Sequence, residues 1–393
     1  MNDWRPQTWA VRAQAEESTH HEHSVPIFLT SSFVFEDSEE MRAAFAGEID
    51  RNIYTRFTNP NVEELSEKIR RLEGAEAGHS LATGMAAVFA TFGALLSSGD
   101  HILACRSLFG STHTILTKVL PRFGITFTYV DAADPDSWPG EIRENTRMIF
   151  VETPTNPAVD LVDLTWLGKL AAEKGVILVV DNCFATPILQ RPLEFGAHLS
   201  IHSATKYLDG QGRVMGGVVV GAKDLVQEIY DFARATGPAL SPFNAWVLSK
   251  SVETLEVRME KHSENALVVA QWLEGQPGVA SVRYPFLPSH PQYKIAKRQM
   301  SSGGGILSFV VEGGLEQGKR FMDSVKLCSL TANLGDTRTI VSHPGSTTHA
   351  KLTEEERQAV GITPGLIRIS VGLEDLRDVI ADVEQALEAS EVT

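Results

Sequence analysis

Short apolar runs recur through the first half of the chain, and each is bounded by Gly, Pro or polar residues. Such runs are typical of strands that are buried on both faces of a sheet. The predicted strands are His79–Ala82, His101–Cys105, Ile125–Val130, Met148–Glu152, Val176–Val180, Leu199–His202 and Gly217–Val220.

Amphipathic helical patterns lie between several of these runs. Apolar residues recur at helical spacing from Val62 to Leu72, after the helix-opening Asn59-Pro60 and before a closing Gly74. Further helices are predicted at Met85–Leu96 and Leu164–Lys174. Strands that alternate with helices predict the α/β class, with a mostly parallel sheet that helices cover on both sides.

The polarity and periodicity of the sequence change twice, which divides the chain into three parts. Residues 1–55 are polar, weakly periodic and interrupted by prolines, and we predict an arm. Residues 56–250 are the large α/β domain, and residues 251–393 are predicted as a smaller α+β domain. The elements predicted around and beyond the second boundary are a helical region at Asn244–Leu273, strands at Val279–Tyr284, Gly305–Val311 and Leu366–Val371, and a last helix from Glu374.

Composition and charge limit the possible partners. The chain has 43% hydrophobic residues, 22% charged residues and a formal net charge of −15, so we expect neither a nucleic-acid nor a membrane partner. Three scattered cysteines fit no disulfide framework and no zinc spacing, which favours the cytoplasm. The N-terminus lacks the apolar core of a signal peptide, and no stretch has the length of a transmembrane helix. His20, His21 and His23 cluster without supporting ligands, and we predict no metal.

Functional side chains are expected where the strands end, because ligands of open α/β sheets bind at the carboxyl ends of the strands. The residues at these ends differ in chemical type. They are Thr83-Gly84, Phe109-Gly110, Glu152, Asp181, and Ser203 to Lys206. We expect them to converge on one ligand.

Two of these ends suit an anionic ligand that binds covalently to an amine. Lys206, partly desolvated after a strand, would deprotonate easily and act as a nucleophile. The hydroxyls of Ser203 and Thr205 can donate hydrogen bonds to a phosphate. The backbone amides of Gly84 and Met85, at the start of an apolar helix, can face the same phosphate.

Two further residues suit an aromatic ligand. Asp181 ends an apolar run, where an acid either caps a helix or pairs with a buried cation such as a protonated pyridine nitrogen. Phe109 offers a flat face to a ring, although by itself it also fits a core position. Taken together with Lys206, these residues favour a shared ligand over separate structural roles.

Seven motifs with these residues, in order along the chain, resemble the Cys/Met-metabolism family of pyridoxal-phosphate (PLP) enzymes, which have the aspartate-aminotransferase fold. The resemblance covers nearly the whole chain. The motifs are Tyr54-Thr55-Arg56, Thr83-Gly84-Met85, Glu152-Thr153-Pro154-Thr155-Asn156-Pro157, Val180-Asp181-Asn182-Cys183-Phe184-Ala185-Thr186-Pro187, Ser203-Ala204-Thr205-Lys206, Ser342-His343-Pro344 and Arg368-Ile369-Ser370-Val371-Gly372-Leu373-Glu374.

The resemblance implies a role for each motif. Lys206 carries the PLP cofactor covalently and later moves protons on the substrate, and Asp181 pairs with the ring nitrogen. Arg368 binds the substrate α-carboxylate, a task suited to a guanidinium, with Asn156 and Ser342 nearby. The other implied cofactor-binding residues are Gly84, Met85, Ser203 and Thr205 at the phosphate, Phe109 at the ring, and Tyr54 and Arg56 at the phosphate of the neighbouring subunit. The active unit is then at least a dimer, and the family is usually a homotetramer.

Several departures from the family pattern bear on the substrate. Phe109 replaces a tyrosine, and Ser111 stands where methionine-degrading members have a cysteine. The loop Asp209–Arg213 resembles the O-succinylhomoserine sulfhydrylase branch of the family. Arg338 replaces a glutamate of several members, which suggests that it binds the succinyl carboxylate of the substrate. The alternative is that Arg338 points to solvent or pairs with an acid such as Asp336.

The resemblance therefore predicts a γ-replacement in methionine biosynthesis, in which sulfide displaces succinate from O-succinylhomoserine and gives homocysteine. The residues alone predict only a base and an electron sink, at Lys206 and Asp181. The alternatives are a cystathionine γ-synthase, which uses cysteine as nucleophile, and a γ-lyase, which eliminates without replacement. A non-catalytic PLP-binding regulator is a further alternative, which the intact Lys206, Asp181 and Arg368 oppose.

Overall fold

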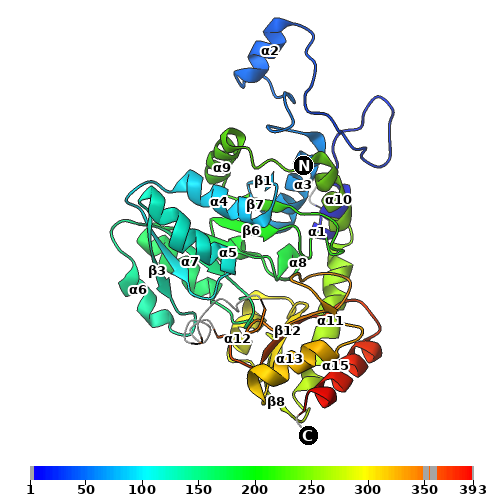
Figure 1. The fold of residues 1–393 in the computed structure, drawn as a ribbon. Coiled ribbons are helices and arrows are strands. Elements are labelled where there is room, and N and C mark those ends of the chain that lie inside the picture. The colour runs from blue at the N-terminus through cyan, green and yellow to red at the C-terminus, as the bar shows by residue number, and fades with distance from the viewer. Residues whose placement is uncertain (1–3, 348–353, 355–360, 392–393) are drawn as a thin grey trace.

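The computed structural model describes residues 4–347, 354 and 361–391. A large and a small sheet, each with its own helices, follow one another along the chain, and the N-terminal arm extends away from the large sheet (Figure 1). Within the described ranges, no helix combines the length and the apolar character that crossing a bilayer requires.

The large sheet has seven strands in the order β1-β7-β6-β5-β4-β2-β3. The strands are β1 (Ala77–Leu81), β2 (His101–Cys105), β3 (Thr126–Val130), β4 (Thr146–Glu152), β5 (Ile177–Asp181), β6 (Leu199–Ser203) and β7 (Gly217–Gly221). Only β7 runs antiparallel to its neighbours β1 and β6, and the other pairs are parallel. All seven predicted strands and the mostly parallel sheet are confirmed.

Helices cover both faces of this sheet. They are α3 (Pro60–Glu73), α4 (Gly84–Leu95), α5 (Gly110–Thr114), α6 (Trp138–Glu141), α7 (Leu164–Lys174), α8 (Thr186–Leu189) and α9 (Lys223–Thr236). The side chain of Asn59 caps α3, and Gly74 ends it in the left-handed conformation, with φ of 70°. The start and the end predicted for this helix are therefore confirmed, whereas α9 was not identified in the sequence.

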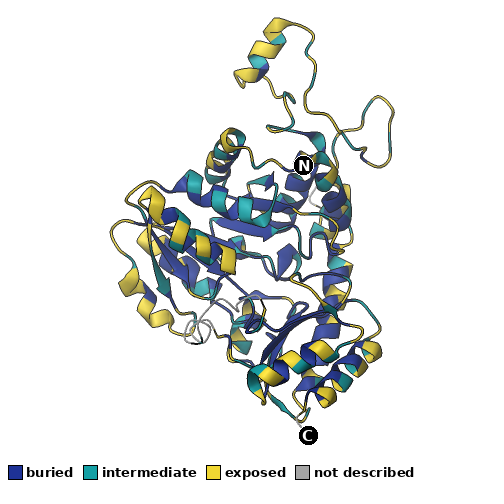
Figure 2. Ribbon diagram, viewed as in Figure 1, coloured by how far each residue is buried: buried dark blue, intermediate teal, exposed yellow. Residues whose placement is uncertain are grey.

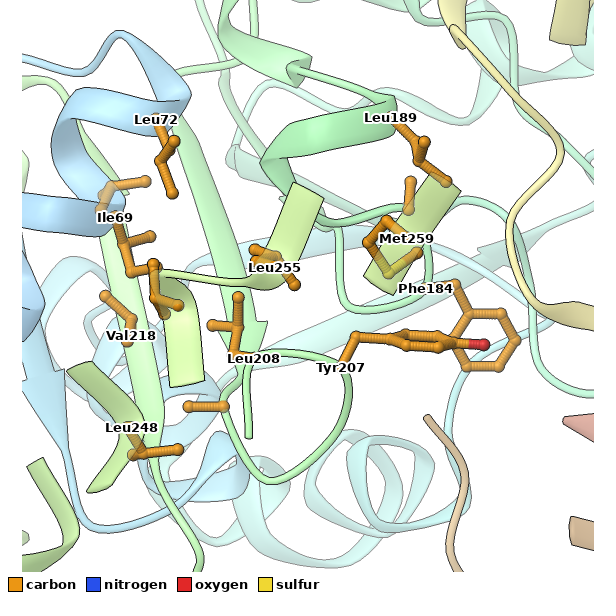
Figure 3. Close-up of a cluster of buried hydrophobic side chains, with 14 of the residues drawn as sticks. Ile69, Leu72, Phe184, Leu189, Tyr207, Leu208, Val218, Leu248, Leu255 and Met259 are labelled. Atoms are coloured by element: carbon orange, nitrogen blue, oxygen red, sulfur yellow. The ribbon is translucent and has the colours of Figure 1, made fainter. Parts of the chain in front are cut away.

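The core explains why the strands read as continuous apolar runs. Ile177 and Val179 of β5 join a buried cluster with α4, whereas Leu178 and Val180 join a cluster with α7 on the other face. Each fully buried side chain of this size contributes about 1.5–3 kcal/mol to stability. A third cluster, drawn in Figure 3, contains Tyr207, so the segment directly after Lys206 is anchored in the core.

The helical region predicted at Asn244–Leu273 is two helices and not one. They are α10 (Pro242–Val252) and α11 (Leu255–Leu273). The break lets α10 pack against α3 while α11 reaches the small sheet. Glu253, which lies in the break, pairs with the fully buried Lys68 at 3.2 Å.

The small sheet has five strands in the order β10-β11-β12-β9-β8. They are β8 (Val279–Arg283), β9 (Ile306–Val311), β10 (Ser329–Leu330), β11 (Ile340–Ser342) and β12 (Leu366–Ser370), with the helices α12 (Tyr293–Gln299), α13 (Gly314–Ser324) and α15 (Leu376–Ser390). The predicted strands β8, β9 and β12 and the last helix are confirmed. The strands β10 and β11 were not predicted, because they are only two and three residues long.

The arm is more ordered and more apolar than its sequence suggested. Helix α1 (Pro6–Arg12) packs on α3, and α2 (Ser38–Phe45) stands away from the rest of the molecule with exposed surfaces (Figures 1 and 2). The exposed apolar side chains of the arm include Leu29, Val34, Met41, Phe45 and Ile49.

Candidate active site

The carboxyl ends of the middle strands bring the predicted residues together. Glu152 and Asp181 end β4 and β5 and are register partners in the sheet. Ser203 ends the next strand, β6, and Lys206 follows it in a turn in which the Lys206 N–H donates to the Ser203 carbonyl at 3.2 Å. An amine, two carboxyl groups and a hydroxyl therefore lie at one edge of the sheet, at the strand ends where we expected them.

Lys206 is held as a partly desolvated amine. Its Nζ donates a hydrogen bond to Oδ1 of Asn333 at 2.7 Å. Burial lowers the pKa of Lys206, and the positive charge of Arg368 lowers it further, against an opposing contribution from Cys183. A lower amine pKa means a larger deprotonated fraction at neutral pH, which suits a nucleophile and a base.

The carboxyl groups of Glu152 and Asp181 lie on neighbouring strands of the site. Burial, followed by the negative charge of Asp181, raises the pKa of Glu152 well above its ordinary value. Burial also raises the pKa of Asp181, to about 6. Glu152 accepts from the Phe109 N–H at 2.9 Å, and Asp181 accepts from the Cys183 N–H at 3.1 Å.

The environment of Asp181 suits a cationic partner. Within the described residues, neither Asp181 nor Glu152 forms a salt bridge, although a buried carboxylate is stabilised by a nearby positive charge. Asp181 keeps part of its surface exposed. A protonated ring nitrogen placed against it would supply the missing charge.

A cradle for an anion lies at the start of α4. The Thr83 hydroxyl caps this helix by accepting from the Ala86 N–H at 3.0 Å. A Cβ atom at Gly84 would come within 2.7 Å of the Ser203 Cβ, so only glycine lets the helix start lie against β6. The free backbone amides of the helix start, together with the hydroxyls of Ser203 and Thr205, suit a phosphate.

A buried arginine from the small sheet completes the site. Arg368 lies in the middle of β12 and is only 6% exposed. Its Nη1 donates to Oδ1 of Asn156 at 2.8 Å, and its Nη2 donates to the backbone carbonyl of Asn333 at 3.0 Å. Its Nε is buried without a partner, and burial lowers the pKa of this guanidinium to about 10. Ser342 is the register partner of Arg368 on β11.

Sequence reasoning missed Asn333, although this residue joins the two halves of the site. Its side chain accepts from Lys206, and its backbone carbonyl accepts from Arg368. Asn333 and Thr205 line the same cavity of about 280 Å³. The available signal was an Asn-Leu-Gly sequence after Leu330-Thr331-Ala332, but the short strand β10 was not recognised.

Tyr54 and Arg56 do not reach this cavity in the single chain. They line a separate cavity of about 340 Å³ together with Thr30 and Pro242. The Arg56 Nη1 donates to the backbone carbonyl of Arg234 at the end of α9. Their assignment to the neighbouring subunit stays a prediction.

Arg338 is engaged by another residue of its own loop. Its Nε donates to Oδ1 of Asp336 at 2.8 Å, and its Nη2 donates to the Gln211 carbonyl at 2.8 Å. The side chain is 63% exposed. These contacts correspond to the alternative stated for Arg338, and its role with the substrate stays a prediction.

Phe109 and Met85 lie at the edge of the site. Phe109 directly precedes α5 and is 44% exposed, so its ring is available for contact with a ligand. The sulfur of Met85 lies 4.0 Å from the Thr112 hydroxyl.

The residues present fit PLP. The cofactor needs an amine for covalent attachment, an acid at its ring nitrogen and an anion cradle. Lys206, Asp181 and the start of α4 supply these three features, and the unpartnered Nε of the buried Arg368 leaves a donor for a carboxylate.

Comparison with known proteins agrees with this geometry. The model of the family described as Cys/Met metabolism PLP-dependent enzymes matches residues 7–388. O-succinylhomoserine sulfhydrylase of Pseudomonas aeruginosa is 49% identical over 97% of this chain and 95% of its own. L-methionine gamma-lyase of Porphyromonas gingivalis is 43% identical over 97% of this chain and 96% of its own.

A solved structure adds the cofactor. A putative O-acetylhomoserine (thiol)-lyase from Campylobacter jejuni, crystallised with a pyridoxyl-lysine, has a TM-score of 0.95 and 34% sequence identity. The match covers 98% of this chain and 100% of that chain. The chain therefore belongs to the Cys/Met-metabolism family of PLP-dependent enzymes, and its cofactor is pyridoxal 5'-phosphate.

Proposed function

We propose that this enzyme catalyses γ-replacement on O-succinylhomoserine with sulfide, giving homocysteine and succinate in methionine biosynthesis. The observation that carries the proposal is the hydrogen-bonded series Lys206–Asn333–Arg368, because an amine that can act as a base lies beside a guanidinium that can bind a carboxylate. The 49% identical relative named O-succinylhomoserine sulfhydrylase supports this choice of reaction.

Each residue of the site has a separate role in the proposed reaction. Arg368 and Asn156 hold the α-carboxylate of the amino acid, with Ser342 beside them. The Lys206 amine would remove the α-proton and later return a proton to the substrate. When bound, PLP supplies the electron sink, and Asp181 keeps its ring nitrogen protonated.

Elimination without replacement is the second candidate. Its support is that several relatives 41–43% identical to this chain are named L-methionine gamma-lyase. Ser111, in place of a cysteine, counts against the methionine-degrading form. A cystathionine γ-synthase differs only in its nucleophile, cysteine, and stays a further candidate.

A competition between nucleophiles tests the proposal. Purified, cofactor-loaded enzyme receives O-succinylhomoserine with sulfide, with cysteine, or with neither, and the amino-acid product is identified. Homocysteine formed chiefly with sulfide is expected. Cystathionine formed chiefly with cysteine would identify a synthase, and 2-oxobutanoate formed equally in all three reactions would identify a lyase.

The exposed apolar arm supports an assembly of at least two subunits. Because the arm leaves Leu29, Val34, Met41, Phe45 and Ile49 exposed, we propose that it packs on a second copy in a cytoplasmic homotetramer. In that assembly, Tyr54 and Arg56 would contact the cofactor phosphate of the neighbouring subunit. Size-exclusion chromatography with light scattering measures the subunit number, and a monomer would contradict the proposal.

A further inference from the structure

A buried glutamate links two neighbouring strands of the large sheet. Glu73 ends α3 and is only 1% exposed. Three side chains converge on its Oε1, namely Asn182 Nδ2 at 3.0 Å, Ser200 Oγ at 2.9 Å and His202 Nε2 at 2.7 Å. Successive side chains of a strand point to opposite faces, so His202 points away from the face on which Ser203 lies. One carboxylate oxygen therefore holds the end of β5 and the strand β6 together.

The position of Glu73 is unfavourable for a carboxylate. The helix dipole opposes a negative charge at the C-terminal end of a helix, and burial removes the hydration of the charge. Within the described residues, His202 is the only group at salt-bridge distance from Glu73. The Glu73 Oε2 and the His202 Nδ1 are buried without partners. A buried pair of this kind is weak evidence for stability, because well-packed apolar side chains stabilise a core as well or better. Its value to the enzyme therefore lies in what it contacts.

The same network reaches the chain behind both acids of the site. Asn182 directly follows Asp181, and its Nδ2 also donates to the Gln190 carbonyl at 2.8 Å. The Gln190 Nε2 donates in turn to the Thr153 carbonyl at 2.8 Å, and Thr153 directly follows Glu152. These contacts therefore fix the backbone directly after each acid.

His202 adds an electrostatic link to these backbone contacts. Burial raises the pKa of Asp181 to about 6, whereas the Cys183 N–H and the charge of His202 lower it. The strands of Asp181 and His202 are neighbours in the sheet, and the 2.7 Å contact with Glu73 holds the imidazole in place there. Glu73 therefore stands behind two separate influences on Asp181, the position of its backbone and the charge beside it.

We propose that Glu73 is a positioning residue for Asp181. It holds Asn182 and His202, and these two side chains fix the Asp181 carboxyl in the orientation that a protonated ring nitrogen needs. Because its contacts are with Asn182, Ser200 and His202, Glu73 acts through its neighbours and not on the cofactor. This inference rests on the proposed role of Asp181 at the ring nitrogen, and it is independent of the substrate and of the nucleophile.

A double-mutant cycle tests the proposal. Glu73→Gln, Asp181→Asn and the double variant are compared with the unchanged enzyme. Two quantities are measured without substrate: the dissociation constant of PLP, and the pH at which the absorbance of the bound cofactor changes. The matched control is Glu64→Gln, because Glu64 lies on the same helix, is 5% exposed and pairs with Lys68 at 3.1 Å.

We expect Glu73→Gln to weaken PLP binding at least about fivefold and to move the absorbance transition. In the Asp181→Asn background, the same substitution should change PLP binding less than about twofold, because the group that Glu73 positions is gone. Equal losses in both backgrounds, or an equal loss in Glu64→Gln, would show that Glu73 only supports the fold and would overturn the proposal.

Two further comparisons keep the outcome decisive. His202→Gln removes the imidazole, and its effect on PLP binding should depend on Asp181 in the same way. It takes the place of Glu73→Gln in the cycle if that variant does not fold. If Asp181→Asn alone changes neither quantity, the role of Asp181 at the cofactor is wrong and the inference falls with it. If Asp181→Asn changes both and Glu73→Gln changes neither, only the inference about Glu73 is wrong.

Discussion

The two sheets contribute to the active site in different ways. The large sheet supplies strand ends and a helix start, so Asp181, Ser203 and Gly84 are placed by the backbone itself. The small sheet supplies side chains that reach across, namely Arg368 from the middle of β12 and Asn333 from a loop. Residues of the large sheet should therefore affect every reaction of the cofactor, and Arg368 only reactions that need the substrate carboxylate.

Loss of the amine should have the largest effect and should act on the cofactor side. We expect Lys206→Ala to lower kcat by at least about 10³-fold, since it removes both the covalent attachment and the base. Absorbance spectroscopy should show cofactor that is bound without a covalent link. Turnover within tenfold of the unchanged enzyme would contradict the assigned role and favour the regulator alternative.

Removal of the acid at the ring nitrogen should come next. We expect Asp181→Asn to lower kcat about 10²-fold for replacement and elimination alike, because the uncharged amide no longer favours a protonated ring. Steady-state kinetics with two nucleophiles measure this loss. A loss of kcat with only one nucleophile would contradict the expectation that residues of the large sheet affect every reaction of the cofactor.

The same residue should make the stability of the cofactor-free enzyme depend on pH. Burial raises the pKa of Asp181 from its ordinary 3.8 to about 6, so the folded state binds the proton more tightly than the unfolded chain. Stability from this group is then fully present below about pH 4 and is lost as the pH rises through 6. The difference is about 3 kcal/mol, from ~2 pKa units. Urea unfolding between pH 4 and 7 measures this change. The free energy of unfolding of the cofactor-free Asp181→Asn variant should fall less with rising pH than that of the unchanged enzyme.

The small sheet is tested by Arg368→Lys, which keeps the charge but loses the paired donors. We expect the KM for the amino-acid substrate to rise about 10- to 100-fold, corresponding to the loss of a bidentate contact. Cofactor retention should stay unchanged, because Arg368 contacts Asn156 and Asn333 and no residue of the anion cradle. Loss of cofactor in this variant would show that the two sheets do not act separately.

The contrast between the two sheets also explains which site residues the sequence predicted and which it did not. Strand ends follow from apolar runs, so Asp181 and Ser203 were found from local pattern, and family motifs added Arg368. Asn333 was missed because its position depends on β10 and on the pairing of β12 with β11, which are contacts between distant segments. Helix α9 was also not identified, and with it Arg234, whose contact with Phe57 joins residues far apart in the chain.

Asn333 itself should have a moderate effect. We expect Asn333→Ala to lower kcat/KM about tenfold, since Lys206 loses its 2.7 Å hydrogen bond while the backbone contact to Arg368 remains. The pH profile of kcat/KM should shift, because this bond holds the amine beside the site. Asn333→Asp is the matched comparison, and its negative charge should raise the amine pKa. An unshifted profile in both variants would assign Asn333 a structural role only.

The smallest effect is expected for Arg338→Ala. The guanidinium is held by Asp336 and by the Gln211 carbonyl, so its removal should loosen the loop that follows Lys206 without removing a substrate contact. An exposed ion pair of this kind contributes little, because solvent screens it. We therefore expect the KM to change less than about threefold, and equally for O-succinylhomoserine and O-acetylhomoserine. A rise confined to the succinyl ester would instead show that Arg338 binds the succinyl carboxylate, and the small sheet would then recognise both ends of the substrate.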